Sequence, residues 1–159
     1  MGRLDEALKY GKRAKELIEP MQSDGEFVRF TLSGLGMTYY FRGDCTEARK
    51  IGEHLLRFGQ GRSDLRCMAM GHTCIGFLMK NIPLSNKKAV EYYGKAIEVA
   101  RKIGAKGTLG VVCLELGILY QLRKKPEMAK TYISESIKPF RECKAKGHLK
   151  KANNIMKSL

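Results

Sequence analysis

The chain has 159 residues, 43% of them hydrophobic, and a formal net charge of +14, which suits one soluble domain with a basic surface. No apolar run approaches the roughly 20 residues that a membrane-spanning helix needs, and the first residues form no apolar secretion segment. Five cysteines, an odd number without a CxxC pair, argue against a disulfide framework. We therefore expect reduced thiols and a cytoplasmic protein.

The first three predicted elements are helices. Residues 4–19 carry an apolar stripe at helical spacing, and Pro20 ends the segment. Ser23-x-x-Glu26 is a capping box that opens a helix to about Phe41. Asp44-x-x-Glu47 opens the next, which ends near residues 59–61.

The following three elements are also predicted to be helical. Ser63 is expected to cap a helix that reaches Lys80, and Ser85 is expected to cap another over residues 86–103. A sixth helix is predicted over residues 108–123. No alternating strand pattern longer than a few positions interrupts these segments.

Two prolines mark the seventh helix. Pro126 falls in its first turn, where the missing amide costs nothing. Pro139 falls late and is expected to kink the helix or to end it near Ser136. A last helix is predicted over residues 148–157.

A motif recurs along these helices. Leu-Gly-x-x-Tyr occurs twice and a related Ile-Gly-x-x-Met lies between, so that the glycines are 40 and 41 residues apart; an alanine follows each glycine by twelve or thirteen residues. Small residues on both helices let antiparallel backbones approach closely, which compensates for the roughly 1 kcal/mol that a helical glycine costs. The markers are Gly36, Gly76 and Gly117, and Ala48, Ala89 and Ala129, preceded by Ala7.

This period predicts an all-α solenoid of antiparallel helix pairs with seven or eight helices. The expected units are an unpaired second-type helix (1–20), three pairs (23–60, 63–104 and 107–142) and a capping helix (145–159). Because the chain opens on a second-type helix, we expect a piece of a longer protein or a truncated copy. The uncovered edge makes a homodimer plausible.

The pattern resembles the tetratricopeptide repeat family over nearly the whole chain, which implies a right-handed superhelix. Typical repeats have about 34 residues, whereas the 40-residue type is similar to repeats in bacterial adenylate/guanylate cyclases and ATPase-containing transcription activators. Residues 35–48 and 88–97 carry most of this similarity. The chain departs from the family in having no tryptophan, and in Gly52 and Ser136, where the family carries a large residue and an alanine.

The resemblance implies a concave groove, lined by the first helix of each pair, that receives a peptide or a partner's helix. A shift of the frame by one position would move these residues away from the groove. The expected lining residues are Phe30, Ser33, Met37 and Tyr40, then Met70, Thr73, Phe77 and Lys80, then Val111, Leu114, Ile118 and Gln121. Ser33 and Met37 do not match the lysine and asparagine with which some members grip a carboxylate, so an apolar guest is favoured.

Catalysis finds no support in the pattern. His54, His72 and His148 have no metal-ligand partner at i+3 or i+4. Cys67 and Cys74 share a helix face, which is more typical of core packing than of a reactive pair. We expect no enzyme activity, cofactor or metal.

The basic charge is concentrated at the C-terminal end, where residues 121–159 hold 11 Lys/Arg and 3 Asp/Glu. It could serve solubility alone, or it could attract an acidic protein, nucleic acid or an anionic surface. Phe140 is the only Phe, Tyr or Trp among residues 138–151, and no nucleic-acid-reading motif appears, so we expect only weak, non-specific nucleic-acid binding and rank it second. The candidate patch comprises Lys138, Arg141, Lys144, Lys146, Lys150 and Lys151.

Overall fold

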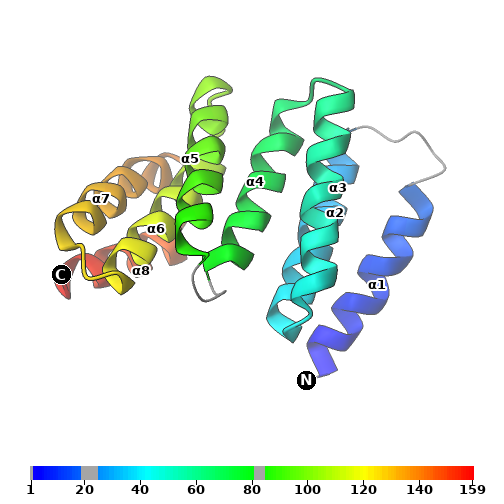
Figure 1. Ribbon diagram of the computed structural model, residues 1–159, viewed down its shortest axis with the longest axis horizontal. Helices are drawn as coiled ribbons and strands as arrows, with labels where there is room; N and C mark the ends of the chain where they lie inside the picture. Colours follow the sequence, from blue (N-terminus) through cyan, green and yellow to red (C-terminus); the bar gives the residue numbers. More distant parts are fainter. Residues whose placement is uncertain (1, 19–24, 81–84) are drawn as a thin grey trace.

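The computed structural model describes residues 2–18, 25–80 and 85–159. Within these ranges the chain forms eight α-helices and no strand, which confirms the all-α prediction (Figure 1). The helices are α1 (Gly2–Ile18), α2 (Gly25–Arg42), α3 (Cys45–Gly61), α4 (Leu65–Lys80), α5 (Asn86–Lys102), α6 (Lys106–Leu122), α7 (Pro126–Glu142) and α8 (Lys146–Lys157).

The helices follow one another in a row, with the two ends of the chain on opposite sides of the molecule (Figure 1). Each helix packs against the next, α2 also contacts α4, and α4 also contacts α6. The first helices of successive pairs therefore line one side of the stack. This arrangement is a solenoid of antiparallel helix pairs.

The recurring glycines lie where two helices touch. A Cβ added to Gly36 would lie 3.1 Å from Ile51, and one added to Gly76 would lie 2.6 Å from the ring of Tyr93. At Gly117 the added atom would lie 2.5 Å from Ile133. Each glycine thus makes room for a large residue on the second helix of its pair. At Gly117 the predicted close approach to the alanine is also present, since the added Cβ would lie 3.2 Å from the carbonyl of Ala129.

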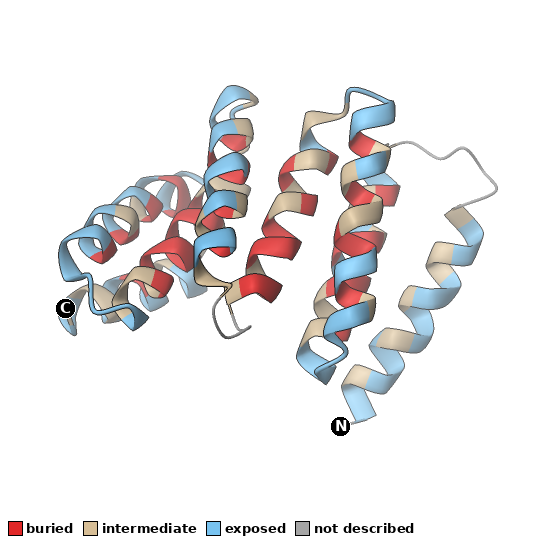
Figure 2. Ribbon diagram, in the orientation of Figure 1, coloured by how far each residue is buried: buried red, intermediate tan, exposed pale blue. Residues whose placement is uncertain are grey.

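Buried residues lie on the helix faces that meet, and exposed residues cover the outside (Figure 2). The core contains three clusters along the stack, one at each helix pair and its neighbours. Helix α1 has no fully buried residue, although Leu8 and Ile18 pack against the cluster at α2 and Asp5 pairs with Arg42. The core is therefore weakest at this end.

The start of α4 corrects one predicted cap. Ser63 has a positive φ of 54° and closes the preceding turn, so its hydroxyl is not the cap. Asp64 takes that role, because its Oδ1 accepts hydrogen bonds from the amides of Arg66 at 2.9 Å and Cys67 at 3.1 Å. The carboxylate satisfies two amides that the first turn leaves free.

Two other predicted caps occupy the cap position without making the capping bond. Asp44 precedes α3 and Ser85 precedes α5, but neither side chain bonds to a first-turn amide. Glu47 pairs with Lys50 at 2.6 Å instead of closing a capping box. The box predicted at Ser23 lies outside the described residues, as does Pro20.

Of the two expectations for Pro139, an end of α7 near Ser136 is wrong. The helix begins at Pro126 as predicted and continues through Pro139 to Glu142. A proline leaves the carbonyl four residues earlier without a helical donor. That carbonyl belongs to Glu135, an exposed residue, so water can satisfy it.

Candidate functional site

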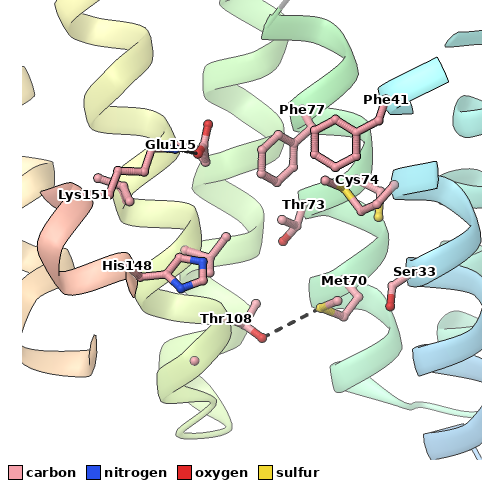
Figure 3. A pocket seen from close by; sticks show the side chains of 15 residues that line it. Ser33, Phe41, Met70, Thr73, Cys74, Phe77, Thr108, Glu115, His148 and Lys151 are labelled. Atoms are coloured by element: carbon pink, nitrogen blue, oxygen red, sulfur yellow. Dashed lines mark hydrogen bonds and ion pairs between the residues drawn. The ribbon is translucent and has the colours of Figure 1, made fainter. Parts of the chain in front are cut away.

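A cavity of about 550 Å³ lies between the first helices of the three pairs, and α8 forms one of its walls (Figure 3). Because α2, α4, α6 and α8 each contribute side chains, the cavity exists only when the pairs stack. We call it the concave cavity. Its lining residues are Ser33, Gly34, Met37 and Phe41 of α2, Met70, Thr73, Cys74 and Phe77 of α4, Gly107, Thr108, Val111, Leu114 and Glu115 of α6, and His148 and Lys151 of α8.

Most of the predicted groove residues line this cavity. The structure brings together one set from all three first helices, namely Ser33, Met37, Met70, Thr73, Phe77, Val111 and Leu114. It leaves out Phe30, Tyr40, Lys80, Ile118 and Gln121. The omitted residues include Tyr40, Lys80 and Gln121, each of which lies four positions after a motif glycine.

The omitted residues have other roles. Phe30 is exposed beneath the guanidinium of Arg29, 4.6 Å from its ring centre. Tyr40 packs against the ring of Phe77 with centroids 6.0 Å apart, and Ile118 packs against the core cluster between α6 and α8. Gln121 is half-buried near the end of α6.

Lys80 contributes to the cavity indirectly, through a carboxylate that sequence reasoning missed. Its Nζ lies 2.6 Å from Oε2 of Glu115, and Nζ of Lys151 lies 3.2 Å from Oε1 of the same residue. The side chains of Glu115 and Lys80 are only 8% and 12% exposed. Glu115 therefore links α4, α6 and α8 at the cavity wall (Figure 3).

A signal for Glu115 was present in the sequence. It is the only acidic residue in the apolar run 107–122, and a buried charge in such a run requires paired cations. It also lies two positions before Gly117. At that position Gly34 and Cys74 line the cavity from α2 and α4.

Two hydroxyl groups in the cavity bond to carbonyls of their own helices, whereas that of Thr108 faces Sδ of Met70 at 3.9 Å. Thr73 donates to the carbonyl of Ala69 at 2.7 Å, and Ser33 donates to that of Phe30 at 3.2 Å. The flexible side chains of Met37 and Met70 line the same cavity. The surface offered to a guest is mainly apolar, with one ion-paired edge.

The histidines and thiols show no catalytic arrangement. Burial and the charge of Lys95 lower the pKa of His72, whose Nδ1 is buried without a partner among the described residues. His148 stacks on Phe140 at 5.0 Å, far along the chain from His54. In the described ranges no three His, Cys, Asp or Glu side chains are grouped to hold a metal ion.

Three of the five free cysteines are buried. Burial raises the pKa of Cys74 to about 12, and burial with the Asp64 carboxylate raises that of Cys67 to about 12. Cys113 is raised to about 12 by burial and by Glu135. Such thiols stay protonated and pack as small apolar groups, as expected for the first two.

The six basic residues near the C-terminus are all exposed. Lys151 reaches into the concave cavity, while Lys138 lines a shallow hollow beside Arg101 and Glu135. The other four lie on the end of α7, the following turn and α8. Lys151 and Lys138 thus lie at different hollows.

Among the described helices, none is long and apolar enough to cross a membrane. No known family model matches the chain, and no curated protein does either. It is similar in structure to BtubC (BKLC) from P. vanneervenii, with a TM-score of 0.73 and 19% sequence identity. The match covers 96% of this chain and 62% of BtubC, and at this identity it concerns the fold alone.

Proposed function

We propose that the chain is a non-catalytic interaction module of the tetratricopeptide type, which binds an apolar peptide or short helix in the concave cavity. The observation that supports this most is the cavity itself. Its volume of about 550 Å³ falls within the range of small binding sites, about 300–1,000 Å³. Exposed apolar hollows on protein surfaces usually mark interaction sites.

The lining favours a guest with one or two large apolar side chains. Met37, Met70 and Phe77 can adapt to different shapes, and the turned-back hydroxyls of Ser33 and Thr73 offer little to a polar guest. A second copy of the chain is the other guest to consider. From the resemblance to bacterial signalling repeats, we infer that the chain has a regulatory or assembly role in the cytoplasm.

A peptide-display selection tests this proposal. Random peptides selected on the unmodified chain should be apolar and should bind with micromolar affinity. Met37→Glu or Val111→Glu should weaken that binding by about tenfold or more, since each buries a charge against the guest. Leu122→Glu, on the exposed end of α6, is the matched control and should leave binding unchanged.

The proposal fails if the selected peptides bind the two cavity variants and the control equally well. Circular dichroism of each variant separates loss of the site from loss of the fold. Sedimentation velocity of the unmodified chain tests self-association: a dimer that Val111→Glu dissociates would identify a second copy as the guest.

Attraction of nucleic acid or an anionic surface by the basic C-terminal end is the second candidate. Five of its six basic side chains lie outside the concave cavity, so the two functions can be separated. We expect weak binding that falls steeply with added salt. Sub-micromolar affinity for mixed nucleic acid at physiological salt, measured by fluorescence anisotropy, would reverse this ranking.

A further inference from the structure

A second, smaller cavity of about 220 Å³ lies at the end of the stack where α2, α4 and α6 begin. It touches the concave cavity at Thr108, which lines both. Its chemistry is different because two arginines form its walls. The lining residues are Arg29, Arg66, Ala69, Ile103, Gly104, Ala105 and Thr108.

Arg29 is held in place with part of its hydrogen-bonding capacity unused. Its side chain is only 14% exposed, and the Nε atom is buried without a partner among the described residues. The guanidinium lies 4.6 Å from the ring centre of Phe30, which fixes its plane. Its ion pair with Glu26 is long, at 3.4 Å. A buried guanidinium N–H without an acceptor is costly unless a ligand supplies one.

Glu26 and Asp64 partly offset the charge of Arg29. Asp64 is half-buried, and although burial alone would raise its pKa, bonds from Cys67 and Arg66 and the charge of Arg29 lower it. Its oxygens accept from two amides and from the thiol of Cys67 at 3.2 Å. The Asp64 carboxylate therefore caps α4 and also interacts with the charge of Arg29.

Arg66 and the start of α6 add positive potential. Arg66 is exposed and makes no ion pair in the described part of the chain. The first turn of α6 contains no acidic residue, and its N-cap is Ala105, which has no side-chain acceptor. The positive end of that helix reaches the cavity through Ala105, although Glu142 pairs with Lys106 of the same turn at 2.9 Å.

We propose that this cavity binds a phosphate group between the guanidinium groups of Arg29 and Arg66. Arginine presents paired donors that match phosphate oxygens, and the hydroxyl of Thr108 can turn from its weak 3.9 Å contact with Met70 to donate as well. The phosphate could be free or carried by a phosphorylated peptide. This site shares Thr108 with the concave cavity but requires no guest there.

Titration calorimetry of the whole chain with inorganic phosphate, at constant ionic strength, tests the site. Arg66→Gln should bind phosphate about tenfold more weakly, because it removes one charged fork. Arg57→Gln is the matched control: Arg57 is exposed on α3, away from the cavity, and its removal should change binding less than about twofold. Absence of binding by the unmodified chain, or an equal loss in both variants, would overturn the proposal.

Two further measurements sharpen the result. Arg29→Lys keeps the buried charge but removes the fork, and it too should weaken phosphate binding while leaving the unfolding midpoint within a few degrees. A phosphoserine peptide provides the second source of the same group. Tighter binding of that peptide than of inorganic phosphate would assign the site to a phosphorylated partner, and equal binding to the free anion.

Discussion

In both α2–α3 and α6–α7, a glycine of the first helix lies against the second helix, yet the two contacts differ in closeness. A Cβ on Gly36 would meet the side chain of Ile51 at 3.1 Å, whereas one on Gly117 would also meet backbone atoms, the amide of Ile133 at 3.1 Å and the carbonyl of Ala129 at 3.2 Å. In the third pair, the backbones of α6 and α7 are therefore in close contact at Gly117.

The two pairs differ more at the end where the first helix begins. Seven positions before the motif glycine, α6 has Gly110 and α2 has Arg29. Gly110 makes room for Phe140 of α7, which is 1% exposed; a Cβ there would lie 2.8 Å from the ring. In α3, the position that corresponds to Phe140 is Gly59, which packs against α4 instead.

This difference shows which parts of the repeat are free to change. The glycine contact in the middle of each pair holds the period, and an aromatic ring closes the end of the third pair. In the first pair a charged side chain occupies that end, and a cavity remains beside it. A charged residue is thus tolerated at the end of a pair where no buried ring has to be packed.

Removal of the ring should produce the largest effect. Phe140→Ala should lower the free energy of unfolding by about 3–5 kcal/mol, because a fully buried aromatic side chain leaves a cavity that the pair cannot close. Urea denaturation followed by circular dichroism measures it. Phe27→Ala, at an exposed phenylalanine of α2, is the control and should change stability by less than about 0.5 kcal/mol.

The two motif glycines should respond unequally to alanine. Gly117→Ala should cost about 2 kcal/mol, since the added methyl group forces two backbones apart. Gly36→Ala should stay within about 0.5 kcal/mol of the unmodified chain, because a small shift of Ile51 accommodates the methyl group and alanine favours the helix. An equal loss of stability in the two variants, measured by thermal unfolding, would show that the two glycine contacts do not differ in this way.

Glu115 gives a smaller difference between the pairs, since the corresponding position of α2 is Gly34. Glu115→Gln should cost about 1–2 kcal/mol by leaving the nearly buried Lys80 without its charged partner. Glu53→Gln, which breaks the more exposed pair with Arg49, is the control and should cost less than about 0.5 kcal/mol. Added salt should narrow the difference if solvent reaches Lys80.

The helix pairs could be predicted because their packing depends on residue size at a fixed spacing. A glycine and an alanine twelve or thirteen residues apart are visible in the sequence, and Gly76 and Ala89 mark the middle pair as clearly as the others. Among the groove residues that the family resemblance implied, Met37, Phe77 and Leu114 do line the cavity, whereas Ile118, one residue after Gly117, does not.

The remaining features depend on the length of side chains and on the direction in which they point. The spacing of residues in the sequence reports neither. Lys80 lies beyond the cavity, but its long side chain extends to Glu115 on the next pair. Gly34, Cys74 and Glu115 lie two positions before the motif glycines and also line the cavity. Each is about one helical turn from another cavity residue of its own helix, and the predicted set omitted all three. Pro139 continues its helix because the carbonyl that it leaves unpaired belongs to an exposed residue.

The absence of any fully buried residue in α1 has a mechanical consequence. In a solenoid each unit is held only by its neighbours, so a load applied to the two ends is carried in series. Under tension, α1 should peel away first, at low force, while Gly117 and Phe140 keep α6 and α7 together to much higher extension. We therefore expect the stack to unfold stepwise under tension, beginning with α1.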